Sequence, residues 1–225
     1  MTQPAAARTL ADQLTSLHAA ILTQIPPGAA QTFDRAVELV ERSGLARVAI
    51  GVGDRAPTFS LPGIDGRLVS LQELLATGPA VVAFYRGGWC PYCNLQLRAL
   101  QATLPEIEAR GARLVAISPQ QPDESLSTAE KAELRFPVLS DTGLQTSRRY
   151  GLVHAVDAQT NAVLRDFGTD LTRVNGSASL ELPMPAVYVI DKSGMITFAH
   201  VDADYRRRAE PRAIVDALQR LVGRS

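Results

Sequence analysis

The chain has few cysteines, few aromatic residues and no excess of charge of either sign. Its 225 residues include only two cysteines, one tryptophan and three histidines, and 23 Lys and Arg are balanced by 23 Asp and Glu. Two cysteines cannot build a disulfide framework, and a chain this long buries enough apolar surface to be stable without one. A net charge of zero does not indicate a nucleic acid or an acidic surface as partner, so we expect neither.

The chain also lacks long hydrophobic runs. No stretch of 18 or more consecutive apolar residues occurs, and polar residues such as Asp12 and Ser16 interrupt the apolar residues near the N-terminus. The first observation predicts no membrane-spanning helix, and the second predicts no secretory signal peptide. We therefore expect a cytoplasmic protein without a membrane partner. In that compartment a C-x-x-C pair is more often redox-active or metal-binding than a structural disulfide.

The two cysteines, Cys90 and Cys93, form such a pair. A zinc site needs four ligands, but there is no second C-x-x-C, and His18, His154 and His200 are far apart along the chain. We therefore expect no metal. Three interpretations of the pair compete: two cysteines that only pack in the core, a metal site, which the missing ligands disfavour, and a redox-active dithiol.

The local context of the pair favours the redox dithiol. The pair follows the apolar run "PAVVAFY" (79–85), which is typical of a strand buried on both faces, and it precedes the helical pattern "NLQLRALQATLPEIEARG" (94–111). Cys90 is therefore predicted at or next to the helix N-cap, with Cys93 in the first turn and Pro91 where a missing N–H is tolerated. Free N–H groups and the helix dipole favour an anion at this end, and a reactive thiolate is such an anion.

Two helical patterns precede the region of the pair. Apolar residues recur at helical spacing over residues 6–25, a Pro-Pro-Gly sequence follows, and a second helix is predicted over residues 32–43 with Gly44 as its C-terminal cap. We predict two parts of the chain: an N-terminal helical extension (1–48) and a main domain (49–225). The extension can pack on the main domain or serve as the arm of a homodimer, and the sequence leaves both alternatives open.

The main domain alternates strand and helix patterns, which predicts an α/β fold with helices on both faces of a central mixed sheet. The expected elements are a hairpin around "GIDG", a short helix capped by Ser70, buried strands over 79–85 and 112–119, a helix over 123–135, a short strand and a short helix in "FPVLSDTGLQTSRRYG", a hairpin over 186–201 and a final helix from residue 210. The less regular stretch 152–182 is predicted to be a long surface excursion.

Several segments resemble a known fold and family. "VVAFYRGGWCPYC" resembles the thioredoxin superfold, where Trp-Cys-x-x-Cys opens the first long helix, and "LPMPAVYVID" looks like the loop and strand that carry a cis-proline facing the active site, here Pro185 after Met184. "GVGDRAPTFSLPGIDGRLVSL" and "FPVLSDTGLQTSRRYGL" resemble the AhpC/TSA, or peroxiredoxin, branch of that fold. The resemblance covers residues 51–222 and implies a thioredoxin-like, peroxiredoxin-type sheet. The helical extension joined to "FYRGGWCPYCNLQLRALQ" is similar to bacterial peroxiredoxin-like proteins.

The active-site segment departs from the family pattern F-Y-P-x-x-x-T-x-x-C. When the Phe-Tyr pairs are aligned, Arg86 replaces the proline and Cys90 replaces the threonine, which places Cys93 at the peroxidatic position. The arginine of the family falls on Pro185. The resemblance thus implies that two groups that hold the peroxide oxygens are replaced. Arg86 is a candidate substitute, and the alternative is an arginine that only contacts solvent or a helix.

The resemblance implies a thiol-dependent hydroperoxide reductase without a metal or organic cofactor. In this mechanism Cys93 attacks the peroxide, Cys90 resolves the sulfenic acid, and an external dithiol such as thioredoxin reduces the disulfide. In the alternative, a thioredoxin-like oxidoreductase, Cys90 attacks a partner disulfide and Cys93 resolves. A redox-sensing adaptor that reacts once per reduction is a third alternative. Trp89 either shields the pair or only packs in the core, and a cis Pro185 would lie against the sulfurs.

Overall fold

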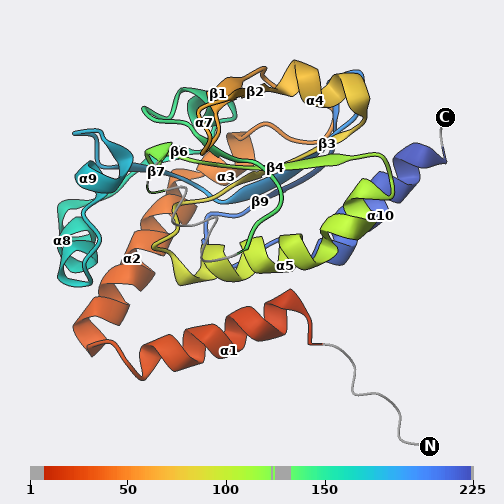
Figure 1. Ribbon diagram of the computed structural model, residues 1–225. Helices are drawn as coiled ribbons and strands as arrows, with labels where there is room; N and C mark the ends of the chain where they lie inside the picture. Colours follow the sequence, from red (N-terminus) through yellow and green to blue (C-terminus); the bar gives the residue numbers. More distant parts are fainter. Residues whose placement is uncertain (1–7, 123, 125–132, 224–225) are drawn as a thin grey trace, which may run out of the picture.

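A five-stranded mixed sheet forms the centre of the molecule (Figure 1). The structure is a computed structural model that describes residues 8–122, 124 and 133–223. The strands, in their order across the sheet, are β5 (Val138–Ser140), β4 (Arg113–Ser118), β3 (Ala80–Phe84), β8 (Ala186–Ile190) and β9 (Ile196–Val201). β3, β4 and β5 are parallel, whereas β8 is antiparallel to both β3 and β9. The predicted α/β class with a central mixed sheet is confirmed.

The side chains of β3 point alternately to the two faces of the sheet and so contribute to two layers of the core. All five residues of β3 are buried, and they pair with β4 on one side and β8 on the other. Val81 and Ala83 pack into the layer under α5, while Val82 and Phe84 pack into the layer on the opposite face. Side chains of successive strand residues point to opposite faces, so a strand that is covered on both faces has apolar residues at successive positions.

Helices cover both faces of the sheet (Figure 1). One face is covered by α5 (Pro91–Glu108) and α10 (Pro211–Val222), and α1 (Leu10–Leu22) packs against α5. The layer on the other face includes residues from α2 (Pro27–Ser43), α3 (Leu45–Val48) and α4 (Leu71–Thr77). The short helix α7 (Gln145–Arg149) follows β5. Among the described helices, none is both long and apolar enough to cross a membrane.

Several local predictions are confirmed by the backbone geometry. β1 (Ser60–Pro62) and β2 (Leu68–Ser70) form the hairpin around "GIDG". Ser70 caps α4, because its hydroxyl accepts the Glu73 N–H while the Glu73 carboxylate accepts the Ser70 N–H. Gly44 ends α2 with a φ of 71°, a left-handed conformation that glycine adopts without steric cost. The helix predicted over 123–135 lies largely outside the described residues.

The stretch 152–182 is not the surface excursion that its irregular pattern predicts. It contains β6 (Val153–Ala155), α8 (Ala158–Asp166) and α9 (Leu171–Asn175), and β6 pairs with β7 (Glu181–Pro183). Leu171 and Leu182 are fully buried in a separate small core. The prediction was wrong because these elements are too short to show a hydrophobic period. The capping aspartates Asp157 and Asp170 were the available signal.

The N-terminal helices pack on the main domain within one chain. Leu10 and Leu14 of α1 are buried in the same layer as α5. The Glu210 carboxylate, just before α10, accepts the backbone N–H groups of Leu10 and Ala11 at 3.2 and 2.7 Å. This carboxylate therefore satisfies two of the free donors at the start of α1. The division into an extension (1–48) and a main domain (49–225) stays a prediction.

Candidate active site

Cys90 and Cys93 lie where β3 passes into α5. Cys90 is the N-cap of α5 with extended backbone angles, φ −88° and ψ 114°, and Pro91 is the first helical residue. Cys93 follows in the first turn. The turn before the helix requires Gly87, whose φ is 146° and where a Cβ atom would lie 2.4 Å from the Trp89 indole nitrogen. Both thiols are buried, with exposures of 1% for Cys90 and 0% for Cys93.

Arg208 contacts the sulfur of Cys93. Its Nη2 lies 3.4 Å from Cys93 Sγ, its Nη1 donates to the Gln96 amide oxygen at 2.5 Å, and its Nε donates to the Tyr205 carbonyl at 2.7 Å. Arg208 and Gln96 are both buried. Three hydrogen-bond partners on separate nitrogens hold the planar guanidinium in one orientation, with one edge toward the sulfur.

Arg208 does not stand out in the sequence. The residue lies 115 positions from Cys93, in the segment between β9 and α10, and it is the last of three consecutive arginines at 206–208. Nothing in the pattern separates the buried member of that run from its neighbours. The signal that could have raised the question is the run itself, since three adjacent cations directly before a helix are poorly placed with respect to the helix dipole.

Arg86 lies beside Cys90. Its Nη1 is 4.0 Å from Cys90 Sγ, and its guanidinium carbon lies 4.9 Å from the Trp89 ring centroid and 4.1 Å from the Tyr205 ring centroid. The guanidinium is therefore held by two aromatic rings, in contacts that contribute from about 0.5 to about 2 kcal/mol each. The structure thus brings two arginines to the pair, one at each sulfur.

The two thiols differ in acidity. Burial raises the pKa of Cys93, but the hydrogen bond from Cys90 and the charges of Arg208 and Arg86 outweigh it, so the pKa lies well below the usual value. For Cys90 burial is again the largest effect, and the hydrogen bond to Cys93 and the negative charge there add to it, so its pKa lies well above the usual value. Within the pair, the proton is therefore favoured on Cys90 and the negative charge on Cys93.

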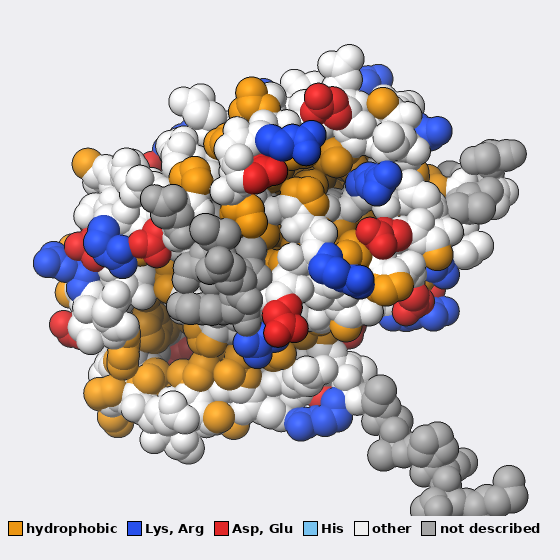
Figure 2. Space-filling model, in the orientation of Figure 1, with side chains coloured by type: hydrophobic (Ala, Val, Ile, Leu, Met, Phe, Trp, Pro, Cys, Tyr) orange, Lys and Arg blue, Asp and Glu red, His pale blue; other side chains and the backbone are white. Residues whose placement is uncertain are grey.

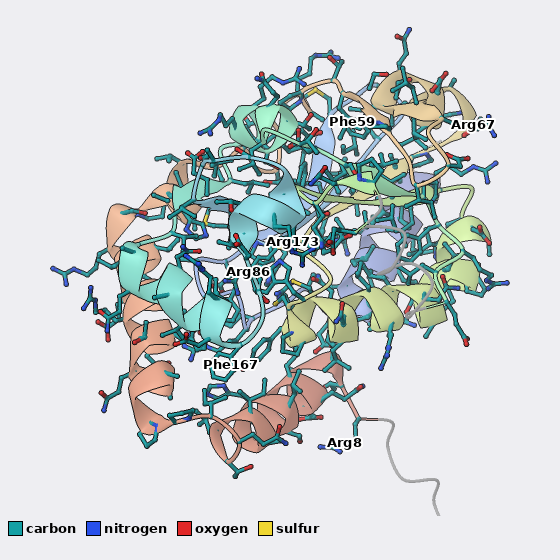
Figure 3. The ribbon with its side chains drawn as sticks, turned by 60° about the vertical axis from the view of Figure 1, so that its left-hand side comes forward. Arg8, Phe59, Arg67, Arg86, Phe167 and Arg173 are labelled. Carbon is teal, nitrogen blue, oxygen red and sulfur yellow. The ribbon has the colours of Figure 1, made fainter. Side chains whose placement is uncertain are left out.

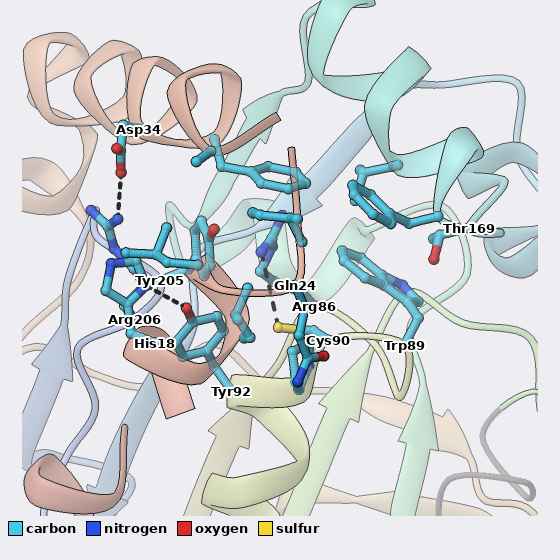
Figure 4. Close-up of a pocket in the computed structure, with 18 residues that line it drawn as sticks. His18, Gln24, Asp34, Arg86, Trp89, Cys90, Tyr92, Thr169, Tyr205 and Arg206 are labelled. Carbon is cyan, nitrogen blue, oxygen red and sulfur yellow. Dashed lines mark hydrogen bonds and ion pairs between the residues drawn. The ribbon is translucent and has the colours of Figure 1, made fainter. Parts of the chain in front are cut away.

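A cavity of about 250 Å³ opens over Cys90 (Figure 4). Arg86, Trp89 and Tyr92 line it from the active-site segment, and side chains of α1, α2 and α8 complete it. The lining is mostly apolar, and Figure 2 shows hydrophobic side chains gathered along α1 beside a hollow. Cys93 is not among the lining residues. Of the two cysteines, Cys90 is therefore the one next to this cavity, although it is only 1% exposed.

A second opening borders Arg208. This cavity of about 410 Å³ is lined by Arg208 and by residues of α1 and of the segment before α10, including Asp204 and Arg206. Its charged lining contrasts with the apolar cavity over Cys90. Arg208, which contacts Cys93 Sγ, forms part of its lining, whereas Cys93 does not.

Met184 and Pro185 lie away from the apolar cavity over Cys90. Both line another cavity, of about 290 Å³, which Arg86 also borders, and Met184 is 1% exposed in the layer on the opposite face of the sheet. No cis peptide bond occurs in the described parts of the chain, so the expected cis-proline at Pro185 was wrong. The trans form is favoured by about 0.5–1 kcal/mol before proline, and the pairing of Ala186 with Phe84 and Val201 is made with a trans bond.

The described residues contain no cluster of three or more His, Cys, Asp or Glu side chains that could hold a metal. The arrangement that is present consists of a thiolate, a neighbouring thiol and two guanidinium groups. Such a pair can attack an electrophilic oxygen or sulfur and then close to a disulfide.

Comparison with known proteins identifies relatives of the chain. A sequence model described as the AhpC/TSA family matches residues 52–199. The chain is 27% identical over 173 residues to a chloroplastic peroxiredoxin Q from Populus jackii, a match that covers 77% of this chain and 68% of that protein. It is 34% identical over 100 residues to peroxiredoxin Bcp from Escherichia coli, and this match covers 44% of this chain and 64% of that protein.

A solved structure with a similar fold is that of peroxidoxin BcpB from Mycobacterium tuberculosis. The TM-score is 0.60 at 19% sequence identity, and the superposition covers 76% of this chain and 98% of that one. At this identity the likeness shows the fold alone. The sequence matches span about two thirds of the length of the two curated relatives.

Proposed function

This chain belongs to the AhpC/TSA family and is a peroxiredoxin-like thiol oxidoreductase with a thioredoxin-like fold, and we propose that it reduces hydroperoxides with Cys93 as the attacking thiolate. The observation that carries the proposal is the contact between Arg208 Nη2 and Cys93 Sγ at 3.4 Å, inside a buried pair whose other member keeps its proton. A thiolate held by a fixed cation is the reactive form of cysteine.

The oxidative half of the cycle uses both sulfurs. Cys93 thiolate attacks one peroxide oxygen, the O–O bond breaks, and the alkoxide leaves and takes up a proton as the alcohol. Cys93 becomes a sulfenic acid. The Cys90 thiol then attacks this sulfur, water leaves, and the Cys90–Cys93 disulfide forms. The spacing of three residues at the start of α5 allows the disulfide across one helical turn.

Arg208 provides the positive charge that the family arginine provides elsewhere. It donates toward the sulfur from which charge flows to the leaving oxygen, and its orientation is fixed before the reaction. Removal of one preorganised donor from an oxyanion hole typically raises the barrier by about 2.7–4 kcal/mol. In this proposal Arg86 is a second cation beside Cys90, Trp89 holds Arg86 and covers the pair, and Pro91 starts α5 so that Cys90 is its N-cap.

The reductive half needs an external thiol donor. Thioredoxin and small thiols are candidate donors, and either must attack a sulfur of the Cys90–Cys93 disulfide. We also propose that the chain assembles as a homodimer through the extension (1–48). Only the sequence supports this part of the proposal.

A second function is favoured by one observation. Cys90 lines the apolar cavity and Cys93 does not, so a disulfide of a partner would reach Cys90 first. In that case the chain would be a thioredoxin-like disulfide oxidoreductase with Cys90 as its nucleophile. The alternative requires the proton of the pair to move from Cys90 to Cys93 before attack.

Turnover with dithiothreitol as donor separates the functions. We expect repeated consumption of hydrogen peroxide or cumene hydroperoxide, lost in Cys93→Ser, and no acceleration of insulin reduction. Insulin reduction without peroxide consumption would instead establish the disulfide oxidoreductase. A single oxidation per reduction, without turnover of either substrate, would establish a redox sensor.

A further inference from the structure

Arg86 is a buried cation that forms no ion pair with any residue that the structure describes. It is 7% exposed, and Figure 3 shows it in the interior of the molecule, whereas Arg67 lies at the edge. Its guanidinium contacts the Trp89 and Tyr205 rings, and its Nη1 lies 4.0 Å from Cys90 Sγ. A buried charge without a counter-ion is unfavourable, so this guanidinium would be stabilised by an anion from outside the chain.

The cavity of about 290 Å³ that Met184 and Pro185 line has room for such an anion beside Arg86. Its apolar wall comes largely from α2, from the start of the segment after β6 and from the residues before β8: Val37, Leu39, Val40, Val156, Met184 and Pro185. Because a water molecule takes about 30 Å³ in the liquid, the cavity holds about ten non-hydrogen atoms. A cation in a mostly apolar cavity matches a molecule with one anionic end and an apolar body.

The other ionisable groups of this cavity do not compensate the charge of Arg86. Asp157 is the only carboxylate among the described lining residues. Its oxygens accept the N–H groups of Gln159 and Thr160, both at 3.0 Å, and the Thr160 hydroxyl at 2.6 Å, at the start of α8. Burial, to which the charge of Arg86 adds, lowers the pKa of His154 to about 4, so its imidazole is neutral at pH 7. Arg86 is therefore the group in this cavity that attracts an anion.

We propose that Arg86 and this cavity form a binding site for a monocarboxylate with a small apolar body. The carboxylate accepts N–H groups from the edge of the guanidinium, a geometry that a planar fork supports with two parallel hydrogen bonds. The two aromatic rings hold the guanidinium, and the apolar body lies against α2. Neither sulfur lines this cavity, so the site is separate from the redox chemistry of the pair.

The redox state of the cysteine pair should change the affinity of this site. In the reduced protein the negative charge is favoured on Cys93, and the charge of Arg86 contributes to this. A bound carboxylate competes with that negative charge, whereas a disulfide carries no charge. The oxidised protein therefore binds the carboxylate more tightly, and by linkage the carboxylate favours the disulfide by the same factor. This part of the inference rests on the dithiol–disulfide cycle of the proposed function.

The test is titration calorimetry of the full chain, oxidised with diamide, with phenylacetate as the probe. Phenylacetamide has the same apolar body without the charge, and we expect it to bind at least about tenfold more weakly, because hydrogen bonds between charged partners are the stronger ones. Acetate has the charge without the body, and it should also bind at least about tenfold more weakly. Equal affinity for phenylacetate and phenylacetamide, or no binding of phenylacetate, would overturn the proposal.

Two pairs of variants locate the site. Arg86→Met should weaken phenylacetate at least about tenfold, against no change for Arg207→Met, whose side chain is 66% exposed. Ala36→Phe fills this cavity and should also abolish binding, whereas Ala30→Phe, on the same helix and also half-buried, fills the cavity over Cys90 and should leave binding unchanged. Loss of binding in Ala30→Phe but not in Ala36→Phe would overturn the proposal, even where Arg86→Met fails to fold.

The redox coupling is tested by the same titration after reduction with dithiothreitol. We expect phenylacetate to bind the reduced protein about fivefold more weakly than the oxidised protein, a factor within the usual range of coupling between two sites. Equal affinities, or tighter binding to the reduced protein, would overturn the coupling. Because calorimetry uses no peroxide, these outcomes are distinguishable from a failure of the peroxidase function.

Discussion

The surroundings of the two sulfurs differ, although the cysteines lie within one helical turn. Cys93 is fully buried, contacts Arg208 and borders no part of the apolar cavity. Cys90 lines that cavity and has Arg86 at 4.0 Å, and it keeps its proton. The negative charge is thus favoured on Cys93, and Cys90 is the residue next to the apolar cavity.

This division follows from where the two arginines originate. Arg86 comes from the segment directly before the pair and is held by Trp89 and Tyr205 on the cavity side. Arg208 comes from the far end of the chain and reaches Cys93 from the segment before α10. A helix N-terminus alone would favour an anion on either cysteine. The hydrogen bonds of Arg208 to Gln96 and Cys93 are what distinguish the two sulfurs.

The largest expected effect is that of removing the cation at Cys93. Arg208→Met is predicted to lower the rate constant for oxidation by hydroperoxide about 100-fold, because a preorganised donor to the reacting sulfur is lost. Arg208→Lys should recover part of the rate, since the charge remains without the fixed planar geometry. Stopped-flow oxidation measures both. The control is Arg207→Met, whose side chain is 66% exposed. Equal losses in Arg207→Met and Arg208→Met would remove the distinction between the sulfurs.

The pH dependence should show the low pKa of Cys93. Only the thiolate attacks, so the oxidation rate constant is expected to stay level as the pH falls from 9, and to drop tenfold per unit only below the lowered pKa. In Arg208→Met the drop should begin at higher pH. A profile that falls from pH 9 in the wild type would contradict the assignment of the thiolate.

Stability should follow the same thiolate. A lowered pKa in the folded state stabilises the reduced protein fully above the unfolded value near 9, and this contribution is lost as the pH falls through the folded pKa. The free energy of unfolding of the reduced wild type, relative to that of reduced Cys93→Ser, should therefore decrease as the pH falls from 9. Urea unfolding at a series of pH values checks the sign. A difference that grows toward acid pH would refute it.

Removal of the cation at Cys90 is expected to have a smaller effect on oxidation. Arg86→Met should lower the rate constant about fivefold, because Arg86 acts on the Cys93 thiolate only through its charge, with no contact to that sulfur. Arg86→Lys keeps the charge and should restore most of the rate. If Arg86→Met slowed oxidation more than Arg208→Met, the roles of the two arginines would be reversed.

The smallest expected effect concerns the helix over Cys90. The contact between His18 and Tyr92 should contribute about 1 kcal/mol to stability, a typical value for one hydrogen bond. A double-mutant cycle of His18→Ala and Tyr92→Phe, followed by urea unfolding, isolates this coupling. No coupling between the two substitutions would mean that α1 is held over the cavity by its N-terminal contacts alone.

Much of the fold could be predicted because its signals are local. The apolar run of β3, the capping residue Ser70 and the terminating Gly44 each act within a few residues of their own position. The placement of Cys90 at the N-cap of α5 likewise follows from the strand before it and the helix after it. The stretch 152–182 was misjudged because its elements have three to nine residues and become stable only by packing on one another.

The site could be predicted only as far as the pair and its neighbours in sequence. Arg86 and Trp89 lie next to the pair along the chain, and the structure places both beside Cys90. Arg208 could not be predicted, because its role depends on how the segment before α10 crosses the start of α5. The cis-proline was expected by resemblance, and the trans bond at Pro185 shows that a matching motif does not fix local backbone geometry.

The most direct test of the account is to mix reduced protein with a small excess of cumene hydroperoxide and to follow Trp89 fluorescence by stopped flow, in the wild type, Cys90→Ser and Cys93→Ser. The account predicts a fast bimolecular phase in the wild type that persists in Cys90→Ser, where oxidation stops at the sulfenic acid, and is absent in Cys93→Ser. A fast phase that persists in Cys93→Ser and is lost in Cys90→Ser would contradict it, because the sulfur with access would then also be the nucleophile.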